Sequence, residues 1–324
     1  MPRRLTWAEM ASGGYKFIKY LTGRGLLSIN LEVTKRCNAF CDFCDYWQEE
    51  SPSELKDYVP VVKKLEPLSL SLTGGEPLLR QDLTQIIASL RKSFGFLFIS
   101  LITNGSLLTT ERGLELWRAG LDEMSISLDY LDERHDRDRG ILNLSAHILS
   151  VASSLRAAGV NLCFNVVVKN GNYREIDKIL SHASKMGIKV SLSTYNCWRI
   201  ENEGHMIPRD ELPSLEGIIA GVKHLKKQLG TLTTSEYYLD RIPEFFEKRG
   251  IPGCTAGLNW LQVTPDGMIK RCSDHAIAGH YSDWHRGFFK PTNCDRCWYS
   301  CRGADQEPWS LKRFLNMARE TFAS

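Results

Sequence analysis

Cys37-Asn38-Ala39-Phe40-Cys41-Asp42-Phe43-Cys44 decides the fold, because its three cysteines follow one another at spacings of four and three residues. Thiolates on a short loop are the usual ligands of iron–sulfur clusters. Three of them bind three irons of a cubane and leave the fourth iron open, and an open position is typical of a catalytic metal site. No fourth ligand for a structural zinc ion stands nearby in the sequence. The loop therefore predicts a catalytic iron–sulfur cluster.

Alternating strands and helices surround this loop. The apolar runs predict strands at 28–34, 68–73, 97–103, 123–128, 160–168 and 189–195, and helices at 81–92, 111–119, 143–157 and 173–186. Such alternation predicts a parallel α/β sheet with right-handed crossovers. Six units are too few for a closed eight-stranded barrel, so we expect a partial (β/α)6 barrel or an open sheet. Its site should lie at the C-terminal ends of the strands.

A second motif, Thr73-Gly74-Gly75-Glu76-Pro77, ends the second predicted strand. The glycines let backbone approach a ligand closely, and the Glu76 carboxylate can pair with an ammonium group. Together with the cysteine loop, this turn resembles the radical S-adenosylmethionine (SAM) superfamily. The signature of that family is C-x3-C-x2-C with an aromatic residue, here Phe43, before the last cysteine, and its GGEP motif contacts the SAM amino group.

The resemblance implies cofactors and a reaction. The open iron of a [4Fe–4S] cluster on Cys37, Cys41 and Cys44 chelates SAM, and the reduced cluster cleaves SAM to methionine and a 5′-deoxyadenosyl radical. The protein supplies position and shielding. The SAM-binding residues that the resemblance implies are Phe43, Gly74, Gly75, Glu76, Asn104, Ser127, Asn165 and Arg139. Those at strand ends also suit caps or turns, and Arg139 also suits a solvated charged loop.

Five further cysteines gather near the C-terminus, at Cys254, Cys272, Cys294, Cys297 and Cys301. The first two form C-x12-G-x4-C around Gly267, which resembles the entry motif of SPASM and twitch extensions. A full SPASM domain carries at least seven cysteines, so we expect one auxiliary [4Fe–4S] cluster, as in the shorter twitch form. Its predicted ligands are Cys254, Cys272, Cys294 and Cys297, with Cys301 as the rival of Cys294. Four thiolates also suit structural zinc, which is the alternative.

The remaining chain divides into predicted segments. We expect an N-terminal helical lead-in at 1–27, a radical SAM core at 28–200, a helical connector at 201–250 and a SPASM/twitch-like domain at 251–324. Within them we expect helices at 210–229, 235–249 and 309–322, and a hairpin at 258–272 that turns at Asp266-Gly267. Cys197 follows the sixth strand, where a thiol could give a hydrogen atom to a substrate radical. A buried structural thiol is the alternative.

Composition narrows the possible partners. The net charge of +3 over 324 residues is too small to indicate nucleic acid. No run of eighteen apolar residues indicates a membrane span, and the N-terminus lacks the core of a signal peptide, so we expect a cytoplasmic protein. Residues 3–24 mix basic and large apolar side chains, which indicates a helix packed on the domain. Peripheral membrane contact is the alternative.

The cysteine loop begins at residue 37, which leaves no room for an N-terminal peptide-recognition domain. We therefore expect an oxidoreductase that takes a hydrogen atom from a small-molecule, sugar or lipid substrate, with the auxiliary cluster accepting an electron. An external donor such as flavodoxin or ferredoxin would reduce the cluster. The alternatives are a maturase of a ribosomal peptide or protein side chain, and a non-enzymatic metal-binding redox module.

Overall fold

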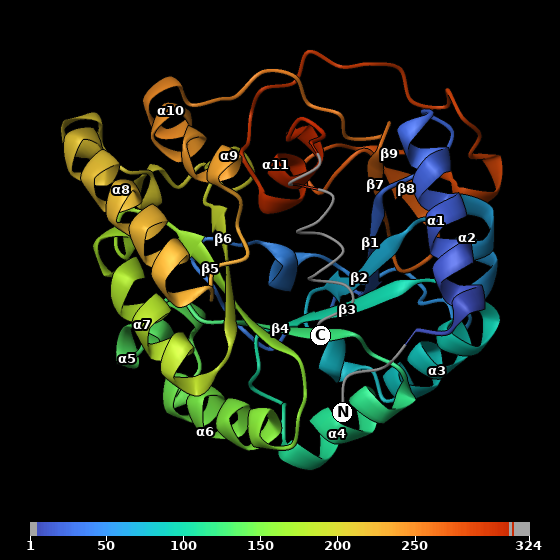
Figure 1. Cartoon of the computed structure of the whole chain (residues 1–324), viewed down its shortest axis with the longest axis horizontal. Helices are drawn as coiled ribbons and strands as arrows, with labels where there is room; N and C mark the ends of the chain where they lie inside the picture. The colour runs from blue at the N-terminus through green and yellow to red at the C-terminus, as the bar shows by residue number, and fades with distance from the viewer. Residues whose placement is uncertain (1–4, 311–312, 314–324) are drawn as a thin grey trace.

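The computed structural model describes residues 5–310 and 313, and its centre is a curved sheet. The strand order among the described residues is β6-β5-β4-β3-β2-β1-β7-β8-β9. Helices cover the outer face of this sheet, and its inner face surrounds a lumen (Figure 1). The predicted partial (β/α)6 barrel is confirmed, because β1 to β6 follow one another in parallel.

The barrel elements have the following bounds. The strands are β1 (Ser28–Thr34), β2 (Ser69–Gly74), β3 (Phe98–Thr103), β4 (Glu123–Ser127), β5 (Leu162–Val168) and β6 (Lys189–Thr194). The helices are α2 (Val59–Leu65), α3 (Leu83–Ser93), α4 (Thr110–Ala119), α5 (Glu133–Arg139), α6 (Leu144–Ala157) and α7 (Ile176–Met186). Of these, α2 and α5 have no counterpart among the predicted elements.

Side chains alternate along the strands between the helices and the lumen. In β2, Leu70 and Leu72 are fully buried in the main core, whereas Ser69 and Ser71 line the lumen. The register places Ser71 beside Ser100 of β3, and their hydroxyl oxygens lie 2.9 Å apart. This period of two packs apolar side chains under the helices and leaves small hydroxyls on the inner face.

The predicted hairpin is present as β7 (Trp260–Val263) and β8 (Met268–Lys270), which pair antiparallel. Gly267 in the turn has a φ of +87°, in the region that favours glycine. β7 also pairs in parallel with β1, and β9 (Ile277–His280) extends the sheet beyond β8. The sheet therefore continues across the predicted boundary between 250 and 251.

The other helices are α1 (Trp7–Leu21), α8 (Leu212–Leu229), α9 (Glu236–Leu239), α10 (Arg241–Lys248) and α11 (Ser300–Gln306). The helix expected at 235–249 is divided near Asp240, because Pro243 lacks an N–H and is tolerated only in the first turn of a helix. The helix expected at 309–322 falls almost entirely outside the described residues. Among the described helices, none has both the length and the apolar character needed to cross a bilayer.

Candidate functional site

The glycines that end β2 lie directly against the chain that enters the cysteine loop. A Cβ atom on Gly74 would stand 2.0 Å from the Thr34 carbonyl oxygen, and one on Gly75 would stand 2.1 Å from that of Arg36. The Gly75 N–H donates to the Thr34 carbonyl at 2.9 Å, and the Glu76 N–H donates to the Arg36 carbonyl at 2.8 Å. The glycines therefore serve a contact within the chain. Their contact with SAM stays a prediction.

Glu76 joins the ends of two strands. Its buried carboxylate accepts hydrogen bonds from Leu78 N at 3.0 Å, Thr103 Oγ1 at 2.6 Å and Asn104 N at 2.7 Å. Burial raises the pKa of this carboxyl, while the hydrogen bonds oppose that shift. Asn104 then donates through Nδ2 to Asn38 Oδ1 of the cysteine loop at 3.0 Å. Glu76 thus positions the loop through β3, and a carboxylate still has room for one further donor.

The three loop cysteines face one another. Burial raises the pKa of the Cys41 thiol to about 12, and the charges of Cys44 and Cys37 act in the same direction. Thiolates of a cubane bind different irons, so they stand farther apart than the ligands of one ion. Over residues 5–310 and 313, no three His, Cys, Asp or Glu side chains are close enough to hold a single metal ion. The donor set fits a cluster with three protein ligands.

Helix α5 brings Arg139 against this loop. The guanidinium is buried, with Nη2 2.7 Å from Asp129 Oδ2 and Nη1 4.0 Å from Cys41 Sγ. Its Nε has no hydrogen-bond partner among the described residues. A buried donor without a partner beside the cluster loop fits an anionic group of a bound cofactor. The charged-loop alternative is wrong, since the residue is helical and buried.

Lys169 is a functional candidate that the sequence reading missed. It follows β5 directly, is fully buried, and places Nζ 4.0 Å from the centre of the Phe43 ring. Its ammonium pairs with Asp138 Oδ2 at 2.5 Å. The available signal was a lysine at the end of the apolar strand β5, where a parallel sheet carries its site.

Two predicted residues, Ser127 at the end of β4 and Asn165 in the middle of β5, are register partners. Asn165 also lines the lumen, in a chamber that reaches Glu123 and Lys189 at the amino ends of β4 and β6, so its contact with SAM stays a prediction. Cys197 differs: its thiol donates to Glu203 Oε1 at 3.3 Å, and it is not among the described residues that line either cavity below. Its role as a hydrogen donor stays a prediction without support from its position.

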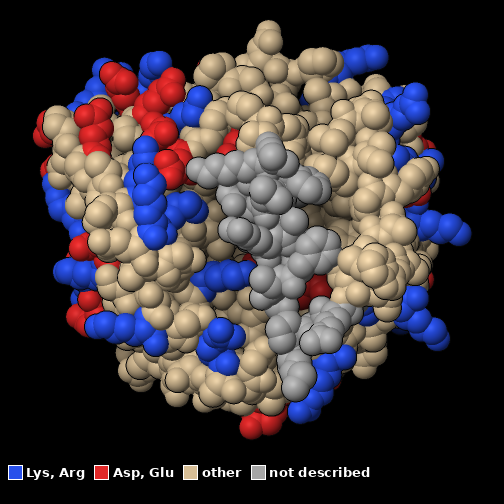
Figure 2. Space-filling model, viewed as in Figure 1, with Lys and Arg blue, Asp and Glu red and all other residues tan. Residues whose placement is uncertain are grey.

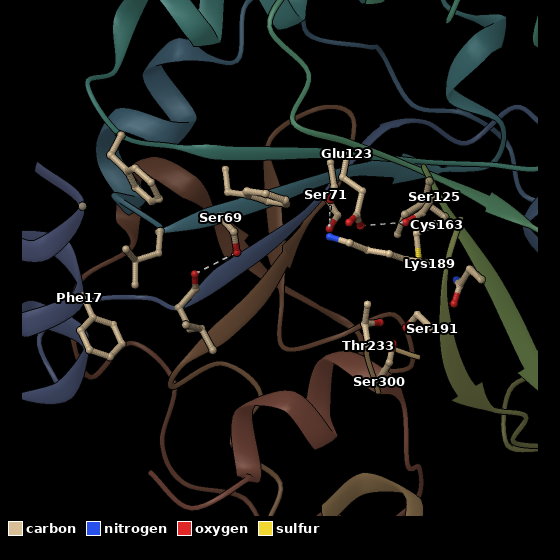
Figure 3. Close-up of a pocket in the computed structure, with 18 of the residues that line it drawn as sticks. Phe17, Ser69, Ser71, Glu123, Ser125, Cys163, Lys189, Ser191, Thr233 and Ser300 are labelled. Carbon is tan, nitrogen blue, oxygen red and sulfur yellow. Dashed lines mark hydrogen bonds between the residues drawn. The ribbon is translucent and has the colours of Figure 1, made fainter. Parts of the chain in front are cut away.

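A cavity of about 710 Å³ lies between the barrel strands and the C-terminal segment. Thr73, Gly74 and Tyr46 line it near the cluster loop, and Tyr299 and Cys301 line it at the C-terminal segment. A second chamber of about 570 Å³ adjoins it and shares several lining residues, including Ser71, Ser191, Thr233 and Ser300. Figure 3 shows Lys189 reaching into this chamber toward Ser71 and Glu123, with Phe17 of α1 at the opposite end.

The five C-terminal cysteines converge at the far end of this cavity. Cys254 and Cys272 pack with Trp260, and Cys294 and Cys301 lie against them. Burial raises the pKa of Cys297 to about 12, and the charge of Cys297 raises the pKa of both Cys272 and Cys301. All five thiols therefore surround one place.

The sequence model of the radical SAM superfamily matches residues 31–207, more than half of the chain. The chain belongs to the radical SAM superfamily. It is accordingly an enzyme, and its family uses a [4Fe–4S] cluster and SAM. The expected family, fold class and cofactors are confirmed at this level. The SPASM/twitch subgroup and the auxiliary cluster stay predictions.

Two proteins with similar sequences are named as cyclases. A probable GTP 3′,8-cyclase of Sulfurisphaera tokodaii is 29% identical over 262 residues, covering 77% of this chain and 82% of that protein. A PqqA peptide cyclase of Gluconobacter oxydans is 26% identical over 258 residues, covering 76% and 70%.

Solved structures with the same fold include SuiB of Streptococcus suis bound to its precursor peptide SuiA. The TM-score is 0.63 at 16% identity, over 86% of this chain and 66% of that one. The enzyme anSMEcpe with AdoMet and the Cp18Cys peptide gives a TM-score of 0.62 at 17% identity, over 81% and 79%. At this identity the likeness establishes the fold alone.

The expected small-molecule, sugar or lipid substrate is corrected by these findings. A relative is named a peptide cyclase, and two solved structures of the same fold hold peptides. The expectation rested on the lack of space for an N-terminal recognition domain. The barrel itself surrounds the cavity, so the early start of the cysteine loop says nothing about what enters that cavity.

The contact between β2 and the loop generates a prediction. Gly75→Ala should lower the iron bound per chain and destabilise the protein by about 1–3 kcal/mol, because the new methyl group meets carbonyl oxygens of the cluster loop. Iron analysis and urea unfolding measure the two effects. The control is Gly217→Ala in α8, which faces open space and should leave iron unchanged. Equal iron in both variants would contradict the role assigned to this contact.

Proposed function

We propose that this radical SAM enzyme modifies a peptide by taking a hydrogen atom from one of its residues. The peptide would reach the cavity between the loop of Cys37, Cys41 and Cys44 and the C-terminal cysteines. When bound, the cluster and SAM supply the 5′-deoxyadenosyl radical that removes the hydrogen atom. The chain's own residues bind and orient the two reactants and exclude water from them.

The observation that carries this proposal is the lining of the cavity. Hydroxyl and amide side chains from three parts of the chain face the cavity. They are Asn30 and Ser71 in the barrel, Thr233 to Ser235 just before α9, and Ser300 next to Cys301. Such groups both donate and accept hydrogen bonds, which suits the amides of an extended peptide. Tyr237 and Tyr238 add flat apolar surface for its side chains.

The balance of charge favours a peptide over a nucleoside triphosphate. The cations among the described lining residues are Lys189, Lys226 and Arg313, and they are matched by the carboxylates Glu123, Glu236 and Glu307. A triphosphate site requires a clear excess of cations. Figure 2 shows acidic and basic side chains intermixed over α8 and α10, and a largely uncharged surface at the upper right. Neither surface presents a strong positive field.

The SAM-binding residues form part of the same proposal. Arg139 and Glu76 would meet the carboxylate and the ammonium of SAM, because both are buried beside the cluster loop. Ser127 at the end of β4 and its register partner Asn165 in β5 would meet its sugar or base. Phe43, Gly74, Gly75 and Asn104 would support it through the loop and the β2 turn, to which the structure connects them.

An auxiliary cluster of the twitch type would occupy the C-terminal site and accept an electron, which makes the net reaction an oxidation. Cys254, Cys272, Cys294 and Cys297 are the proposed ligands, with Cys301 as the rival. The convergence of the five thiols supports this proposal. Arg302 is fully buried, with Nη1 3.9 Å from Cys297 Sγ, and would offset thiolate charge.

A substrate comparison tests the peptide proposal. The reconstituted enzyme, SAM and dithionite are incubated without oxygen, either with a pool of short synthetic peptides of varied sequence or with GTP. We expect one peptide to lose hydrogen in a SAM-dependent manner, seen by mass spectrometry, and GTP to stay unchanged. Consumption of GTP with every peptide unaltered would overturn the proposal.

Single cysteine variants test the auxiliary site. The wild-type protein should hold about eight irons per chain, and Cys254→Ala should hold about four, since one of two cubanes is lost. Cys294→Ala should also fall to about four, while Cys301→Ala should keep about eight. The reverse result for the last two variants would make Cys301 the ligand. Zinc in place of iron would contradict an auxiliary cluster altogether.

A further inference from the structure

Two fully or nearly fully buried cations stand on one side of the cluster loop. Lys169 is 0% exposed and Arg139 is 6% exposed. Lys169 Nζ lies 4.0 Å, and the Arg139 guanidinium 5.4 Å, from the centre of the Phe43 ring. Since Phe43 directly precedes Cys44, both positive charges lie close to the loop that would hold the cluster.

Each cation has its own carboxylate. Asp138 Oδ2 is 2.5 Å from Lys169 Nζ, and Asp129 Oδ2 is 2.7 Å from Arg139 Nη2. Asp129 also accepts a hydrogen bond from Val167 N at 2.8 Å through its other oxygen. Buried charges persist only when they are paired in this way, and removing one partner leaves the other uncompensated.

The backbone holds Lys169 in place. Its N–H donates to Asn172 Oδ1 at 2.9 Å, and Asn172 Nδ2 donates to the Val167 carbonyl at 2.8 Å and to the Asp129 carbonyl at 3.2 Å. This turn ties the end of β5 to the segment after β4. The backbone of Lys169 is therefore fixed relative to the cysteine loop, and its buried ammonium group does not move into solvent.

The neighbouring histidine adds no charge. Burial lowers the pKa of His135 to about 3, and the Arg139 charge acts in the same direction. The ring is neutral at ordinary pH, and its Nδ1 accepts from Asp129 N at 3.1 Å. Besides the two ion pairs, the charged groups near Phe43 and Cys44 are Asp42, whose carboxylate lies 3.1 Å from His205 Nε2, and the Arg199–Asp45 pair.

We propose that the Lys169–Asp138 pair sets the reduction potential of the SAM cluster: the Lys169 charge raises this potential, and the Asp138 charge lowers it. Reduction adds one electron from an external donor to the cluster, and a nearby positive charge stabilises the added negative charge. Burial strengthens the effect, since little water screens it. Both are positioning residues, because neither contacts the cluster ligands directly.

The test is a potentiometric titration of the reconstituted full-length protein, followed by the electron paramagnetic resonance signal of the reduced cluster. Lys169→Met should shift the midpoint to more negative potential, and Asp138→Asn should shift it to more positive potential. A tenfold change in the ratio of reduced to oxidised cluster corresponds to about 59 mV. The control Lys185→Met removes an exposed charge from the last turn of α7 and should leave the midpoint unchanged.

Midpoint shifts of opposite sign in the two variants support this proposal. If the two residues had only a structural role, the two substitutions would not shift the midpoint in opposite directions. Unchanged midpoints, or shifts in the same direction, would overturn it. If Lys169→Met fails to take up iron, Asp138→Asn decides alone, because it keeps the shape of the carboxylate. Lys169→Arg keeps the charge and should keep the potential near that of the wild type.

Discussion

The close contact between the end of β2 and the exit of β1 is the constraint on which the site depends. Two glycines let the β2 turn touch the carbonyl oxygens of Thr34 and Arg36. Glu76 then connects this turn to β3, and Asn104 connects β3 back to the cysteine loop. Contacts with three consecutive strands, β1 to β3, therefore hold the cysteine loop in place. They fix the orientation of its thiols relative to the barrel.

The far side of the cavity depends on an extension of the same sheet. Because β7 pairs with β1, the hairpin that precedes Cys272 is built onto the strand that precedes Cys37. Gln262 of β7 donates to Glu32 of β1 and, at 3.1 Å, to Tyr46 just after the cluster loop. One sheet therefore fixes the position of the C-terminal hairpin relative to the strand that leads into the cluster loop.

Much of this arrangement could be predicted from the sequence, for physical reasons that differ between parts. The periodicity of β1 and the cysteine spacing indicated a cluster loop on a parallel barrel. Helix α5 was not predicted, because its residues are mostly charged and show no apolar period. It is stabilised by the Asp132 cap and by buried ion pairs, which no local sequence pattern reveals. The β1–β7 pairing joins segments distant in sequence, and Lys169 meets Asp138 and Phe43 only through contacts between separate parts of the barrel. The expected substrate class was wrong because the prediction rested on the position of the cysteine loop along the sequence, which carries no information about the cavity.

The central claim is that the loop of Cys37, Cys41 and Cys44 generates a radical from SAM. The most direct measurement is the release of 5′-deoxyadenosine when the reconstituted full-length protein is incubated with SAM and dithionite without oxygen. The account predicts release by the wild type and none by Cys41→Ala. No release from a wild-type protein that holds its full iron and sulfide would contradict it.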